Sequence, residues 1–98
     1  MIKIFRVSGG SMSPALNHGD YVLASRWFLK PEAGRLVVVR HGKLGIIVKR
    51  IAEKTSQGFW LKSDNALGSS TSSMGMISYG QLMGTVFFII RKNKTTPS

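Results

Sequence analysis

One serine and one lysine in this sequence have the residue type and the local setting for nucleophilic attack and proton transfer. Ser11 follows two glycines and precedes Pro14, so it stands on a sharp corner between two apolar, alternating segments. Lys49 lies in a β-branched segment, where residues two apart share a face of a strand. Lys49 therefore shares its face with Ile47 and Ile51, two good core residues.

A lysine accepts a proton from a serine hydroxyl only in its neutral form. Its ordinary pKa is about 10.4, and burial lowers that pKa by up to about 3–5 units. A desolvated lysine beside a corner serine is the Ser-Lys variant of nucleophilic catalysis. The alternatives are a serine turn without chemistry and a lysine whose stem lies along the core edge while its ammonium reaches water.

Other catalytic sites lack the residues they need. His18 and His41 are the only histidines, and neither has a carboxylate partner at a recognisable spacing, so a Ser-His-Asp triad is unsupported. Four scattered acidic residues make a carboxylate pair or a metal cage improbable, and the lack of cysteine removes thiolate sites and disulfides. The sequence predicts no metal and no cofactor.

The elements that position these two residues are predicted to be strands. A chain of 98 residues with 43% hydrophobic residues predicts a single domain over residues 1–92, followed by a frayed tail over residues 93–98. No segment shows a sustained helical period, so the fold class is all-β, a small coiled antiparallel sheet or partly open barrel. A polar loop is expected over 63–73 and a turn or single helical turn over 78–84. About six strands are expected, over 2–7, 20–26, 35–40, 44–51, 59–62 and 85–91.

The charge and the exposed apolar residues bear on partners. The formal net charge of +10 favours anionic partners, but the basic residues are spread out and no nucleic-acid-binding motif is present, so nucleic acid is an unlikely partner. No signal peptide or membrane-spanning segment is visible, which predicts a cytoplasmic protein or one peripheral to the membrane. The apolar triplet Trp27–Leu29 is expected to tuck its aromatic rings against the core, and its alternative is contact with a substrate or an anionic membrane.

Four segments carry a resemblance to a known superfamily. Residues 8–16, then 19–23, resemble the nucleophile box Gly-x-Ser-Met-x-Pro-Thr-Leu…Gly-Asp of the type I signal peptidases and their LexA-like relatives, the S24/S26 serine peptidases. Residues 48–51 resemble the Lys-Arg box of that superfamily. Residues 63–72 resemble its late Gly-Asp-Asn…Ser-x-Asp-Ser box, and residues 81–86 resemble its closing strand.

The resemblance implies a fold of the signal peptidase–LexA kind and a serine endopeptidase that removes a leader from a protein precursor bound as an extended peptide. It implies that Ser11 is the nucleophile and Lys49 the base, with the Ser11 backbone and Gly10 at the oxyanion. It implies that Ser69 orients the lysine amine, with Ser70 and Ser72 as stand-ins. The motif residues that support the site are Met12, Pro14, Gly19, Asp20, Arg50, Asp64 and Asn65.

The sequence also departs from the superfamily pattern. Ala15 replaces a common threonine, Gly9 stands where some members have an oxyanion serine, and Ser63 replaces the glycine of the late box. Thr71 and Ser73 replace an aspartate and an arginine, so the ion pair within that box is lost. A catalytically degenerate peptide-binding module and a basic nucleic-acid-binding module are therefore the alternatives. The compact form itself resembles the maturation proteases of nickel-type superoxide dismutase.

Overall fold

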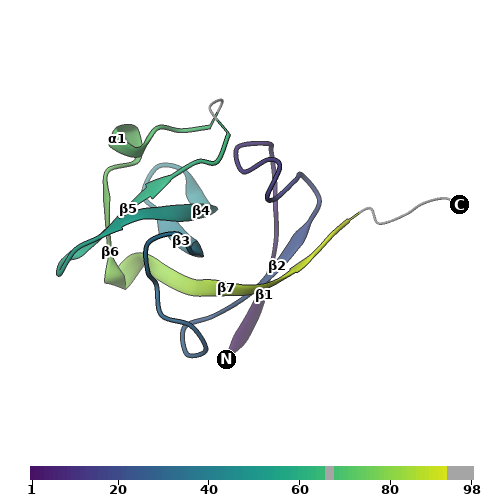
Figure 1. The fold of residues 1–98 in the computed structure, drawn as a ribbon, viewed down its shortest axis with the longest axis horizontal. Coiled ribbons are helices and arrows are strands. Elements are labelled where there is room, and N and C mark those ends of the chain that lie inside the picture. The colour runs from purple at the N-terminus through teal and green to yellow at the C-terminus, as the bar shows by residue number, and fades with distance from the viewer. Residues whose placement is uncertain (66–67, 93–98) are drawn as a thin grey trace, which may run out of the picture.

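The structure, a computed structural model, describes residues 1–65 and 68–92, so the predicted tail over 93–98 lies outside the described residues. Its seven strands form one open antiparallel sheet in the spatial order β1-β2-β7-β3-β4-β5-β6 (Figure 1). The predicted all-β class is confirmed. The strands are β1 (Ile2–Arg6), β2 (Tyr21–Ser25), β3 (Leu36–His41), β4 (Gly45–Lys54), β5 (Gly58–Lys62), β6 (Met76–Ser78) and β7 (Leu82–Ile90).

β7 is the last strand in the sequence, but it lies between two other strands and not at an edge of the sheet. It pairs with β2 on one side, where Thr85 lies opposite Ser25, and with β3 on the other, where Thr85 lies opposite Val37. β7 therefore joins the N-terminal pair β1–β2 to the remaining strands (Figure 1). β3 and β4 form an antiparallel hairpin, with Val37 opposite Lys49.

Two apolar clusters pack on the sheet, and β3 contributes to both. Val37 and Val39 belong to the first cluster, while Val38 belongs to the second, because successive side chains of a strand point to opposite faces. The first cluster also contains Ile51, Phe59, Leu61, Met74, Ile77 and Leu82. The second contains Val7, Met12, Leu16, Val22, Ala24 and Val86. Lys49 is close in sequence to the first cluster, and Ser11 to the second.

The expected elements differ from the observed ones in the region after β5. The structure has seven strands where about six were expected, because the three residues of β6 carry too little pattern to predict a strand. The expected polar loop over 63–73 contains the start of a four-residue helix, α1 (Thr71–Met74), whose N-cap Ser70 accepts a hydrogen bond from the backbone of Ser73. The single helical turn expected over 78–84 is the 3-10 helix η1 (Tyr79–Gln81). Neither described helix is long and apolar enough to cross a bilayer.

The prediction that the aromatic triplet packs inward is wrong for its first two residues. Trp27 is 79% exposed and Phe28 is 58% exposed. Phe28 packs its ring edge against Phe87, with 5.1 Å between the ring centroids. Neither Trp27 nor Phe28 belongs to one of the two core clusters, and the indole remains in solvent.

Candidate active site

Ser11 lies on a turn that is closed by backbone hydrogen bonds. Gly9 has a φ of +78°, a conformation that favours glycine, and its N–H donates to Nδ1 of His18 at 3.0 Å. Past the serine, the N–H of Ser13 donates to the carbonyl of Gly10 at 3.1 Å. The peptide bond before Pro14 is cis. The turn therefore presents Ser11 in a fixed position, as the glycines and the proline predict.

Two apolar side chains fix this turn to the second core cluster. Met12 is 2% exposed and Leu16 is fully buried, and the N–H of Leu16 donates to the carbonyl of Met12 at 2.8 Å. The next residue after Ser11 is thus a core residue, and burial of such a side chain contributes about 1.5–3 kcal/mol to stability. The methionine of the predicted motif positions the serine by packing.

Asp20 holds the far end of the same turn. Its buried carboxylate accepts hydrogen bonds from the backbone N–H of Asn17 and of Lys92, both at 2.9 Å, and lies 3.4 Å from the guanidinium of Arg91. The bond from the Lys92 N–H is the main reason why the pKa of Asp20 lies below its ordinary value. Gly19, at a φ of +93°, donates its N–H to the carbonyl of Val7 at 2.8 Å. Gly19 and Asp20 therefore support the site structurally.

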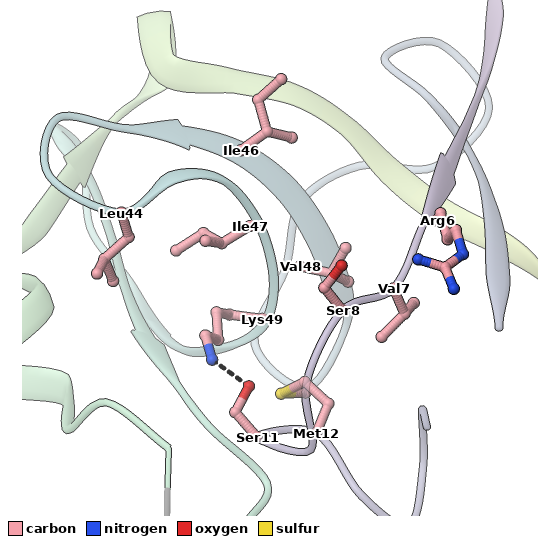
Figure 2. Close-up of a pocket in the computed structure, with 10 residues that line it drawn as sticks. All are labelled: Arg6, Val7, Ser8, Ser11, Met12, Leu44, Ile46, Ile47, Val48 and Lys49. Carbon is pink, nitrogen blue, oxygen red and sulfur yellow. Dashed lines mark hydrogen bonds between the residues drawn. The ribbon is translucent and has the colours of Figure 1, made fainter. Parts of the chain in front are cut away.

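Lys49 on β4 points at Ser11. Its side chain is buried, and its Nζ donates a hydrogen bond to Oγ of Ser11 at 2.5 Å (Figure 2). Burial lowers the pKa of Lys49 below its ordinary value, and the negative charge of Asp64 opposes part of this shift. The structure thus brings the serine and the lysine together, and it favours the neutral amine that a base requires.

The loop after β5 closes on the back of the serine turn. The N–H of Asn65 donates to the carbonyl of Ser11 at 2.8 Å, and the N–H of Asp64 lies 3.4 Å from the sulfur of Met12. Gly68 packs so tightly here that a methyl group placed on it would lie 2.6 Å from Cβ of Ser11. The late box therefore touches the nucleophile turn through its backbone, and Gly68 is a site residue that the sequence analysis did not identify.

An ion pair connects the Lys-Arg box with the late box. Arg50 donates to both carboxylate oxygens of Asp64, from Nε at 2.9 Å and from Nη2 at 2.7 Å, and its Nη1 donates to the carbonyl of Gly34. This pair raises the pKa of Arg50 and lowers that of Asp64. The pairing of Arg50 with Lys62 across β4 and β5 brings the two groups together. The register of β4 and β5 is not visible in the sequence, so the sequence alone does not predict the ion pair of Arg50 and Asp64.

The backbone carbonyl of Ser69 accepts a hydrogen bond from Oγ of Ser63 at 2.9 Å. Within residues 1–65 and 68–92, no hydrogen bond joins Ser69 to Lys49. The hydroxyls of Ser70 and Ser72 lie 3.5 Å apart at the start of α1. The orienting role of Ser69 stays a prediction.

A cleft of about 280 Å³ opens beside the Ser11–Lys49 pair. One wall is formed by the chain that leads from β1 into the serine turn, including Arg6, Val7 and Ser8; the other is formed by β4 and the residue before it, including Leu44, Ile46 and Val48 (Figure 2). Arg6 and Leu44 were not identified from the sequence, because a wall residue has no motif of its own, whereas Ser8 opens the segment that resembles the nucleophile box.

The β4 wall of the cleft offers a free strand edge. β3 pairs with β4 from Gly45 to Arg50, whereas β5 pairs with β4 only from Arg50 to Lys54. Among the described strands, none pairs with the second edge of the segment 45–49. The backbone N–H groups of Gly10 and Ser11 also donate no hydrogen bond within the described part of the chain. The cleft therefore combines a strand edge, a serine–lysine pair and the free amide of Ser11, and Gly10 directly precedes this serine.

An open antiparallel sheet that sets a serine turn against a buried lysine defines the class: a module of the serine-peptidase or LexA-like type. The sequence profile of the Peptidase S24-like family matches residues 2–86. Since this match covers most of the sequence, the chain belongs to that family. A search of curated proteins found no match.

Proposed function

We propose that this protein is a serine endopeptidase that cuts an extended segment of a protein precursor with a Ser11–Lys49 dyad. The observation that carries the proposal is the hydrogen bond between the Lys49 amine and the Ser11 hydroxyl at the floor of the cleft. A buried amine whose pKa is lowered is the kind of base that activates a serine at neutral pH. Membership in the Peptidase S24-like family supports the reaction class.

In the proposed reaction, the neutral amine of Lys49 takes the hydroxyl proton while Oγ of Ser11 bonds to the scissile carbonyl carbon. The carbonyl oxygen gains negative charge, and the backbone N–H groups of Ser11 and Gly10 are the donors proposed to bind it. Such a donor contributes about 2.7–4 kcal/mol to transition-state stabilisation in a well-formed site. Lys49 then passes its proton to the leaving amine, and water releases the acyl group from the serine.

The substrate is proposed to bind as an extended strand. Residues 45–49 of β4 offer an unpaired edge within the described sheet, and added strands use such edges through main-chain hydrogen bonds. The apolar walls, with Val7, Ile46 and Val48, suit small apolar side chains of the substrate. A leader at the start of a precursor is flexible enough to adopt this conformation.

The test is cleavage of a library of unstructured peptides and of leader-bearing precursors, including one of the nickel-type superoxide dismutase, followed by mass spectrometry. Ser11→Ala and Lys49→Arg are each expected to lower cleavage by at least about 10³-fold, since the first removes the nucleophile and the second a base that can lose its proton. Lys43→Arg, in the exposed turn before β4, is the matched control and should cleave like the wild type.

Cleavage by Lys49→Arg at close to the wild-type rate would contradict Lys49 as the base. Saturable peptide binding without cleavage by the wild type would instead support the degenerate, peptide-binding alternative. Circular dichroism of the Ser11→Ala variant should match that of the wild type, because a corner hydroxyl contributes little to stability.

A further inference from the structure

One face of the β1–β2–β7 half of the sheet exposes large apolar side chains. Ile4 is 58% exposed and Phe88 is 56% exposed, and both lie opposite Leu23 in the strand register. Residues two apart in a strand share a face, so the neighbours of these residues extend the same surface. We call this surface the apolar face; it consists of Ile2, Ile4, Tyr21, Leu23, Phe88 and Ile90.

An ordered aromatic loop stands at one end of the apolar face. Ile2 pairs with Ser25, the last residue of β2, so the loop that begins with Arg26 lies next to the start of β1. Oγ of Ser25 accepts a hydrogen bond from the backbone N–H of Trp27 at 3.0 Å, and the rings of Phe28 and Phe87 are in T-shaped contact. These contacts hold the loop in place while the Trp27 indole remains 79% exposed.

The segments that carry the apolar face and its aromatic loop contain mostly basic charged residues. Residues 1–29 and 82–92 contain one acidic residue, Asp20, which is buried and bonded to the backbone. The basic residues of the same segments are Lys3, Arg6, Arg26, Arg91 and Lys92. A second copy of this chain would bring like charges together on this face, which disfavours a symmetric dimer. An anionic surface is electrostatically complementary to it.

We infer that the apolar face and Trp27 bind reversibly to an anionic lipid surface. Exposed apolar side chains on one face of a sheet can insert among acyl chains, and an exposed indole is suited to the level of the lipid headgroups. The surrounding lysines and arginines are attracted by anionic headgroups over about a Debye length. This inference does not depend on the proposed peptidase activity.

The experiment is binding of the chain to vesicles of phosphatidylcholine alone and of phosphatidylcholine with phosphatidylglycerol, followed by co-sedimentation and by tryptophan fluorescence. A Trp60→Phe variant leaves Trp27 as the only indole. We expect binding to the anionic vesicles with a blue shift of Trp27 emission, weaker binding at physiological than at low salt, and little binding to neutral vesicles.

Substitutions of apolar residues separate their contribution to vesicle binding from the contribution of the basic residues. Ile4→Ser and Trp27→Ala are each expected to weaken binding to anionic vesicles by roughly fivefold. Met76→Ser is the matched control, because Met76 is 44% exposed on β6 at the other edge of the sheet, and its binding should equal that of the wild type. Thermal unfolding of each variant shows that it is folded.

Three outcomes would overturn the inference. The first is no binding to anionic vesicles at low salt. The second is binding that depends on salt but is unchanged by Ile4→Ser and by Trp27→Ala, which would reduce the effect to charge alone. The third is a blue shift of Trp27 of the same size with poly-glutamate, which would identify an acidic polypeptide as the better partner for this surface.

Discussion

The strand that carries Lys49 and the turn that carries Ser11 are built on different physical principles. Lys49 lies within β4, where pairing with β3 fixes the backbone and where Ile51 belongs to the first core cluster. Ser11 lies on a turn with no strand pairing of its own. Single contacts fix that turn, among them the packing of Met12 and the bond from the N–H of Asn65.

This difference indicates how each residue responds to substitution. A paired strand distributes its restraint over many hydrogen bonds, so one change nearby moves Lys49 little. The turn depends on a few groups from distant parts of the chain, so the loss or the crowding of any one of them moves Ser11. We therefore expect substitutions around the turn to affect the site more than equivalent substitutions around β4.

Among substitutions of groups that support the serine turn, the largest effect is expected from Gly68→Ala. The added methyl group would lie 2.6 Å from Cβ of Ser11 and 2.5 Å from Oγ of Ser63, so the loop or Ser11 must move. A displacement of about 1 Å lowers the rate by about 100-fold. Gly42→Ala, where nothing lies within 4 Å, is the matched control, and kcat against a peptide substrate is the measurement. Equal rates for both variants would show that the turn tolerates crowding.

A smaller effect, on stability, is expected from Asp20→Ala. The variant leaves the backbone N–H groups of Asn17 and Lys92 without their acceptor, which costs about 1–3 kcal/mol in the free energy of unfolding. Glu32→Ala removes an exposed ion pair with Arg35 and should cost less than about 1 kcal/mol. Urea unfolding of both variants measures the difference.

The pH dependence of this effect follows from the lowered pKa of Asp20. The folded state binds the proton of Asp20 less readily than the unfolded state, so the stabilisation is present above the unfolded pKa of about 3.9. It is lost as the pH falls through the lower, folded pKa. The difference in the free energy of unfolding between wild type and Asp20→Ala should therefore become smaller in acid. A difference that does not change with pH would contradict this role of the carboxylate.

The smallest effect concerns the protonation of Lys49. The carboxylate of Asp64 favours the charged ammonium, so Asp64→Asn should lower the pKa of Lys49 further and move the rising limb of the activity profile to lower pH. Arg50→Gln frees that carboxylate from its ion pair and should shift the limb to higher pH. Lysine side-chain NMR measures the pKa of Lys49 in each of the two variants without a substrate. Shifts in the same direction for both variants would contradict this electrostatic coupling.

The sequence predicted the strands and the closeness of Ser11 and Lys49 better than the contacts around them. Alternation placed Lys49 on the face of Ile51, and the glycines with Pro14 indicated the corner at Ser11, since both signals are local. The pair of Arg50 and Asp64 depends on the register of β4 and β5, which local pattern does not encode. The exposure of the Trp27 indole depends on how the loop after β2 packs in the folded chain. The apolar character of the residue alone predicted burial.

The location of β7 has a consequence for when the site can exist during synthesis. β2 and β3 are both synthesised long before β7, yet both pair with β7 in the sheet. The carboxylate of Asp20 likewise accepts a hydrogen bond from the backbone N–H of Lys92, which follows β7. Pairing across such sequence separations is slow to form, because the chain between the partners must first be ordered. A nascent chain that has not yet released β7 from the ribosome therefore lacks the support for its serine turn. We expect the turn that carries Ser11 to reach its final geometry only after translation has passed Lys92.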